Sequence, residues 1–182
     1  MVSSVSKRRS LRYHRLRRSQ TVPASLERVF PFFESPDNLA MITPPSLGFR
    51  VITPGPVAMR EGRVIDYHIR LGVLPVRWRS LISTYDPPFS FVDEQLRGPY
   101  AYWHHTHCFE SCAQGTVLKD EVVYALPAGV PWPLESMVHA VYVQPALEHI
   151  IDYRARFYAD FFDTRPAESA AGRLLVGTET RS

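Results

Sequence analysis

The chain has only two cysteines in 182 residues and no long apolar run. Cys108 and Cys112 lie four positions apart in or near one expected strand, too few and too close for a disulfide framework, so a reducing, cytoplasmic setting is expected. No segment approaches the roughly 20 apolar residues of a membrane span, so stable membrane insertion is not expected. Arg8-Arg9 resembles a twin-arginine pair, but no apolar run follows it, and export is not expected either.

Motifs for nucleotide and nucleophile chemistry are also missing. The chain has 9 glycines, but they form no loop of the kind that cradles phosphates. There is no G-x-S-x-G elbow, and neither cysteine has a distinctive flanking motif. Nucleotide cofactors and nucleophilic catalysis are therefore disfavoured, and we expect no cofactor.

Acidic residues are absent from positions 1–18, which hold seven of the 21 lysines and arginines. The pI near 9.0 belongs to this arm, because the rest of the chain has 14 basic and 18 acidic residues. A basic arm can contact nucleic acid or anionic lipid, but a solvated terminus is commoner, so we expect no specific nucleic-acid partner.

The predicted organisation is a disordered basic arm (1–10), one domain (11–163) and a flexible polar tail (164–182), in a monomer or homodimer.

What is present is a regular order of elements. A strand is predicted over 11–22, followed by short helices over 24–33 and from Ser35 onward. Six further strands are predicted, joined by short connections that make neighbours antiparallel: 48–53, 62–71, 76–85, 89–96, 102–111 and 116–126. Over 133–162 the apolar residues recur at helical steps, although Pro145 must kink or restart the helix. Since only this helix is long enough to cover the sheet, the pattern predicts an α+β fold in which the helix packs on an antiparallel sheet. If the sheet curves around the helix, a cavity is left between them.

Polar and titratable side chains gather on one predicted hairpin, which turns at Gly98-Pro99. Strand side chains alternate between faces. Asp93 and Gln95 therefore share one face of the first strand. One face of the second strand presents Trp103, His105, His107 and Phe109.

The turn also predicts which of these side chains meet. Antiparallel pairing about Gly98–Tyr100 sets Asp93 near His107 and Gln95 near His105. A second turn at Gln114-Gly115 brings Asp120 toward His107 or Cys108. A carboxylate beside a histidine fixes its tautomer and raises its pKa, as a general base requires. The same pair also serves as a buried polar contact without chemistry, and the sequence leaves both interpretations open.

A metal site is the other interpretation of the histidine pair. His105 and His107 point the same way from one strand, and can bind Zn²⁺ or Fe²⁺ if a third ligand arrives, with Asp93 and Asp120 as candidates. The spacing of Gly98, the histidines and Glu110 departs from the cupin motif that it loosely resembles, and no second cupin motif follows. We therefore expect histidines bonded to carboxylates or carbonyls, and no metal.

Large rings follow one another in the predicted strands. Core packing is the commoner fate of such rings, but beside isolated polar groups under a helix they also form the wall of an apolar-ligand cavity. The rings are Tyr67, Trp78, Trp103, Phe109 and Tyr124. Arg79 is a candidate anchor for a carboxylate or phenolate, and a solvated or salt-bridged arginine is its alternative.

Short motifs in a fixed order run through residues 13–163. They are Val22-Pro-Ala-Ser25, Val29-Phe-Pro-Phe-Phe33, Asn38-Leu39, Ile42-Thr-Pro-Pro45, Asp66-Tyr67, Trp78-Arg79, Phe91-Val-Asp-Glu-Gln95, Gly98-Pro-Tyr100, Trp103, His107-Cys-Phe109, Gly115-Thr116, Asp120 and Tyr124-Ala-Leu-Pro127. This order resembles the SRPBCC (START/Bet v 1-like, polyketide cyclase-like) superfamily, most of all a bacterial group within it. The resemblance implies a helix-grip fold, with an antiparallel sheet around a long C-terminal helix and a deep cavity for hydrophobic or aromatic ligands.

Two functions follow from the residues and the resemblance. The first is binding of a hydrophobic or aromatic small molecule. Its predicted contacts are Tyr67, Trp78, Arg79, Asp93, Gln95, Trp103, His105, Phe109 and Tyr124. The alternative is a cofactor-independent cyclase/dehydratase, in which His107 backed by Asp120 or Asp93 abstracts a proton. Arg79 or Tyr67 would then stabilise the enolate.

Overall fold

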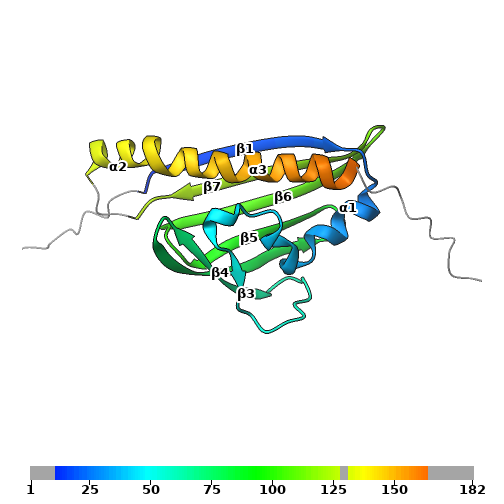
Figure 1. The fold of residues 1–182 in the computed structure, drawn as a ribbon, viewed down its shortest axis with the longest axis horizontal. Helices are drawn as coiled ribbons and strands as arrows, with labels where there is room; N and C mark the ends of the chain where they lie inside the picture. The colour runs from blue at the N-terminus through cyan, green and yellow to red at the C-terminus, as the bar shows by residue number, and fades with distance from the viewer. Residues whose placement is uncertain (1–10, 128–130, 164–182) are drawn as a thin grey trace, which may run out of the picture.

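A computed structural model describes residues 11–127 and 131–163, and its centre is a seven-stranded antiparallel sheet beneath a long helix (Figure 1). The strands are β1 (Tyr13–Val22), β2 (Arg50–Val51), β3 (Val64–Leu71), β4 (Leu74–Asp86), β5 (Ser90–Arg97), β6 (Tyr102–Cys112) and β7 (Gly115–Ala125). Their order across the sheet is β1-β7-β6-β5-β4-β3-β2, so the first strand returns to pair with the last. The predicted α+β helix-grip fold is confirmed.

The helical elements lie between β1 and β2 and after β7. They are α1 (Leu26–Phe33), the 3₁₀ turns η1 (Pro36–Ala40) and η2 (Pro45–Leu47), α2 (Trp132–Val138), the π-helical η3 (His139–Val143) and α3 (Gln144–Asp163). In Figure 1, α2 and α3 form one long rod along the β1 and β7 side of the sheet. The wide turns of η3 end at Val143, two residues before Pro145. Pro145 has no N–H to donate to the preceding turn, so the predicted interruption appears as a change of helical period.

One predicted strand is shorter in the structure than expected, and two predicted segments lie outside the described residues. The strand predicted over 48–53 is reduced to Arg50–Val51, and Pro54 and Pro56, which cannot donate to a ladder, follow it closely. The predicted arm at 1–10 and tail at 164–182 lie outside the described residues. Within the described residues, no helix has both the length and the apolar character needed to cross a membrane.

Two buried clusters hold α3 on the sheet. In the larger one, Phe33 of α1 meets Phe109 of β6 edge-on at 4.9 Å, and Phe162 of α3 packs into the same cluster with only 1% of its surface exposed. In the smaller one, Tyr124 of β7 packs with Leu147 near the start of α3. The helix is thus anchored at both ends.

Gly115 begins β7 where the chain passes very close to the end of β1. Its φ is +129°, and a Cβ there would lie 2.1 Å from the carbonyl oxygen of Val22. Because this neighbour is backbone and cannot rotate away, Gly115→Ala is expected to lower the free energy of unfolding by about 2 kcal/mol. Urea unfolding measures this loss. Gly62→Ala is the matched control, since Gly62 has φ +75° but no heavy atom within 4 Å, and its loss is expected near 1 kcal/mol. Equal losses in the two variants would contradict the clash.

Candidate functional site

A cavity of about 160 Å³ lies between the sheet and α3, and the segment 35–49 contributes to its wall. Most of its lining is apolar. From the sheet come Ile65, Tyr67, Ile69, Trp78, Ile82, Phe91, Trp103 and Val122, and from α3 come Leu147, Ile150 and Ile151. A dry apolar cavity of about 150 Å³ is known to hold benzene. This one therefore has room for at least one aromatic ring.

The alternation of side chains along the strands makes this lining. On β3, Ile65, Tyr67 and Ile69 face the cavity, whereas Asp66 and His68 between them face the other side of the sheet. Tyr67 and Trp78 of the neighbouring strand share a polar contact, because the hydroxyl of Tyr67 and the indole Nε1 of Trp78 each lie 3.2 Å from Ser80 Oγ.

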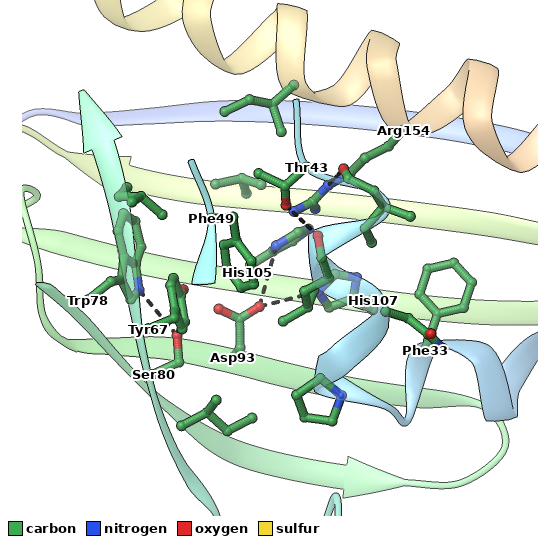
Figure 2. Close-up of a pocket in the computed structure, with 18 of the residues that line it drawn as sticks. Phe33, Thr43, Phe49, Tyr67, Trp78, Ser80, Asp93, His105, His107 and Arg154 are labelled. Carbon is green, nitrogen blue, oxygen red and sulfur yellow. Dashed lines mark hydrogen bonds and ion pairs between the residues drawn. The ribbon is translucent and has the colours of Figure 1, made fainter. Parts of the chain in front are cut away.

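One wall of the cavity carries Asp93, His105 and His107 (Figure 2). Asp120 of β7 contacts both histidines from outside the cavity lining and completes a cluster of two histidines and two aspartates. His105 Nε2 is hydrogen-bonded to Asp120 Oδ1 at 3.1 Å, and His107 Nε2 to Asp93 Oδ2 at 3.2 Å. The other two ring nitrogens face the opposite carboxylates. His105 Nδ1 lies 3.4 Å from Asp93 Oδ2, and His107 Nδ1 lies 2.8 Å from Asp120 Oδ1 without the alignment of a hydrogen bond. Every imidazole nitrogen of the cluster therefore faces a carboxylate.

Burial and the neighbouring charges shift the pKa values of Asp93, Asp120 and His105. Burial is the largest influence on Asp93 and raises its pKa, but the hydrogen bonds and charges of His105 and His107 outweigh burial and hold the pKa below its usual range. The same balance lowers the pKa of Asp120. Burial lowers the pKa of His105, yet its hydrogen bonds to Asp120 and Asp93 raise it overall, to about 8. At neutral pH both aspartates are ionised and His105 carries a proton.

The predicted pairings are partly met. Asp93 and Asp120 both contact His107 as expected, but the contact of Gln95 with His105 is wrong. The ladder pairs Asp93 with His105, a shift of two residues that keeps every side chain on its predicted face and changes its partner. Gln95 does not reach His105 because it is hydrogen-bonded at the turn, where its Nε2 donates to the carbonyl oxygen of Tyr100 at 2.7 Å. Gln95 therefore lies outside the cavity lining.

Arg79 does not lie at the cavity. It is on the opposite face of β4 from Trp78 and Ser80, where Nε and Nη2 each donate to a carboxylate oxygen of Asp66 at 2.9 Å. Its side chain is 43% exposed. The alternative of a salt-bridged arginine is therefore the one observed, and the structure does not place Arg79 as a ligand anchor.

Two of the five predicted rings also lie outside the cavity lining. Phe109 packs in the larger core cluster, and the hydroxyl of Tyr124 is hydrogen-bonded to His139 Nε2 at 2.8 Å. Tyr67, Trp78 and Trp103 line the cavity as predicted. The structure thus brings the inner rings together and assigns the other two to packing.

The arginine at the cavity is Arg154 of α3, which the sequence reasoning missed (Figure 2). It is half-buried, and its Nε donates to the carbonyl oxygen of Ile42 at 3.3 Å. In the part of the chain that the structure describes, no carboxylate forms an ion pair with it. The helical period contained the signal, because Arg154 is one heptad after Leu147 and four residues after Ile150, on the side that faces the cavity.

Comparison with known proteins supports the fold. Family models give no match to this sequence, and neither do curated proteins. Among solved structures, the Zhui aromatase/cyclase from Streptomyces sp. R1128 is 17% identical with a TM-score of 0.63, over 84% of this chain and 94% of that one. Protein CV1439 from Chromobacterium violaceum is 16% identical with a TM-score of 0.60, over 83% and 99% of the two chains. Norcoclaurine synthase from Thalictrum flavum is 14% identical with a TM-score of 0.58, over 84% and 98%.

The element order, the sheet topology and these likenesses define a helix-grip protein with an internal cavity. The chain shares the fold of these solved structures, and this is the helix-grip fold that the resemblance of its motifs implied. At identities below 20%, the likeness extends to the fold alone.

Proposed function

We propose that this protein binds a small apolar or aromatic molecule that carries an acidic group, a carboxylate or a phenolate. The observation that supports this most is Arg154, a half-buried cation that lines an otherwise apolar cavity and has no carboxylate partner among the described residues. The sequence predicted an arginine anchor for such a ligand at Arg79, and Arg154 takes that role in the proposal.

The surroundings of Arg154 support an anionic partner. A guanidinium next to apolar walls loses part of its hydration, and an acidic ligand group restores the lost interactions with charge-assisted hydrogen bonds. The rest of the ligand would pack against Tyr67, Trp78 and Trp103, which supply flat apolar surfaces. Burial of that surface provides affinity, and the arginine provides orientation.

The arrangement of the histidines favours binding over the alternative cyclase/dehydratase. A general base needs an imidazole nitrogen within hydrogen-bond reach of the substrate. Here each nitrogen of His105 and His107 already faces a carboxylate oxygen within 3.4 Å. Two solved structures with this fold are enzymes by name, an aromatase/cyclase and norcoclaurine synthase, so acid–base catalysis stays the second candidate.

Arg154→Leu is expected to weaken binding of an acidic aromatic probe about 10- to 100-fold, because charge-assisted hydrogen bonds contribute about 1.5–3 kcal/mol. The probes are 2-naphthoate and 2-naphthalenemethanol, which share one ring system and differ in charge. Calorimetric titration of each probe into wild type and variant measures the effect. The neutral alcohol is expected to bind both proteins with similar affinity.

Arg79→Leu is the matched control, since it removes an arginine from the opposite face of the sheet and should leave naphthoate binding unchanged. Native mass spectrometry of wild type purified from its own source should also show a bound acidic small molecule. Absence of any saturable binding of both probes, together with a ligand-free mass spectrum, would contradict a binding function. Equal loss in the two arginine variants would contradict the role of Arg154.

A further inference from the structure

The histidine and aspartate cluster has a second property that ligand binding does not use. Asp93 Oδ2 lies 3.4 Å from His105 Nδ1 and 3.2 Å from His107 Nε2. One donor atom from each of the three residues lies within 4.8 Å of the others. Around one transition-metal ion with bonds of about 2.0–2.2 Å, neighbouring ligand atoms lie about 3–3.4 Å apart. The distances to the Asp93 oxygen are therefore those of ligands that share an ion.

The sheet fixes this geometry. Asp93 of β5 is directly opposite His105 of β6, and His107 is two positions further along β6 on the same face. His105 and His107 are both more than nine-tenths buried. Donors held by the ladder of a sheet need little rearrangement to bind an ion, in contrast to donors on loops.

Asp120 of β7 lies behind the two imidazoles. It is hydrogen-bonded to His105 Nε2 and lies 2.8 Å from His107 Nδ1, the ring nitrogens turned away from Asp93. Metal-binding histidines characteristically donate their other ring N–H to a carboxylate, which fixes the tautomer and orients the ring. The buried Nδ1 of His107, which lacks an aligned hydrogen bond, is the atom that would make this bond.

The charge of the cluster also favours a bound cation. The cluster holds two carboxylates on side chains that are only about 20% exposed. Buried carboxylates need compensating positive charge, and one divalent cation supplies enough to neutralise both. Two imidazoles and one carboxylate suit zinc and its neighbours, whereas Mg²⁺ and Ca²⁺ prefer oxygen ligands throughout.

We propose that Asp93, His105 and His107 bind one divalent first-row transition-metal ion, with Asp120 as the positioning residue behind the two imidazoles. The expectation from sequence was no metal, and the register of β5, β6 and β7 is what changes it. All three ligands line the cavity, so a bound ion is accessible to a ligand there. The proposal is independent of the proposed ligand, because the ion can be titrated with the cavity empty.

The test uses the full chain without a histidine tag, treated with chelator and titrated with Co²⁺ and Zn²⁺. Wild type is expected to bind one ion per chain, with visible absorption bands for Co²⁺ and a calorimetric signal for Zn²⁺. Asp93→Asn and His107→Gln are expected to weaken binding at least about 100-fold, and Asp120→Asn about 10- to 100-fold. His104→Gln should bind as wild type does, because His104 lies on the other face of β6 near Glu94.

The proposal is overturned if wild type binds neither ion, if Asp93→Asn binds as tightly as wild type, or if His104→Gln loses the ion. Circular dichroism checks that each variant folds. X-ray absorption at the zinc edge of the wild-type complex decides the case even where a variant does not fold. Nitrogen and oxygen ligands alone support the site, whereas sulfur ligation would assign the ion to Cys108 or Cys112 and contradict it.

Discussion

Phe162→Ala is expected to lower the free energy of unfolding by about 3–5 kcal/mol, because it leaves a cavity in the cluster that holds the end of α3 on the sheet. Phe162 is 1% exposed. Its ring meets Phe32 of α1 and Phe161 of α3 edge-on, at centroid distances of 5.7 and 5.1 Å. The cavity left by the variant can close only if α1 and α3 move together. We therefore expect the loss of unfolding free energy to lie in the upper part of this range. Urea unfolding followed by circular dichroism measures it.

Phe89→Ala is the matched control, since it removes the same ring from the turn between β4 and β5, where Phe89 is 55% exposed. Its expected loss is below about 1 kcal/mol. Phe162 does not line the cavity, so a folded Phe162→Ala protein should still bind naphthoate. Similar losses in the two variants would show that α3 is not held by this cluster.

Much of the site's composition was predictable because the two-residue period of a strand is insensitive to small errors of register. The predicted turn put Asp93 opposite His107, and the ladder pairs it with His105. The error was two residues, so both histidines and the aspartate stayed on the inner face. The alternation of side chains along a strand therefore predicts which residues line a cavity more reliably than it predicts which residues contact each other.

The exact pairing was not predictable because it depends on side-chain contacts at the turn. Gln95 both donates to the carbonyl of Tyr100 and accepts from its N–H, so one side chain sets where the hairpin closes. No local pattern distinguishes that role from ligand binding. The partner of Arg79 was equally hard to predict from local sequence, because Asp66 lies 13 positions earlier on a neighbouring strand.

Arg154 was missed for a different reason. A charged residue in an amphipathic helix is ordinarily assigned to the solvent side, and the apolar face was judged from its apolar members. The position of Arg154 relative to Leu147 and Ile150 placed it on the inner side, but its hydrogen-bond partner, the buried carbonyl of Ile42, comes from the segment 35–49. That segment has no regular period from which its path could be predicted.

Asp120→Ala is expected to lower the free energy of unfolding by about 3 kcal/mol in metal-free protein at neutral pH. Removing one partner from a buried ion pair typically costs about 3–5 kcal/mol, and the 20% exposure of Asp120 favours the lower end. The variant leaves His105 Nε2 and His107 Nδ1 facing a void, so two buried polar atoms lose their partner at once. Urea unfolding in the presence of chelator measures the effect without a contribution from metal.

Glu121→Ala is the matched control, because it removes the neighbouring carboxylate from the opposite face of β7. Glu121 pairs there with Arg15 and Arg17 of β1, whose side chains are 55% and 63% exposed. Ion pairs with such exposed partners contribute about 0–1 kcal/mol, so the expected loss is at most about 1 kcal/mol. If Asp120→Ala lost no more than Glu121→Ala, the cluster would be loosely hydrated rather than a fixed part of the fold. It would then lack the rigidity that metal binding requires, so this comparison tests the physical basis of the proposed metal site.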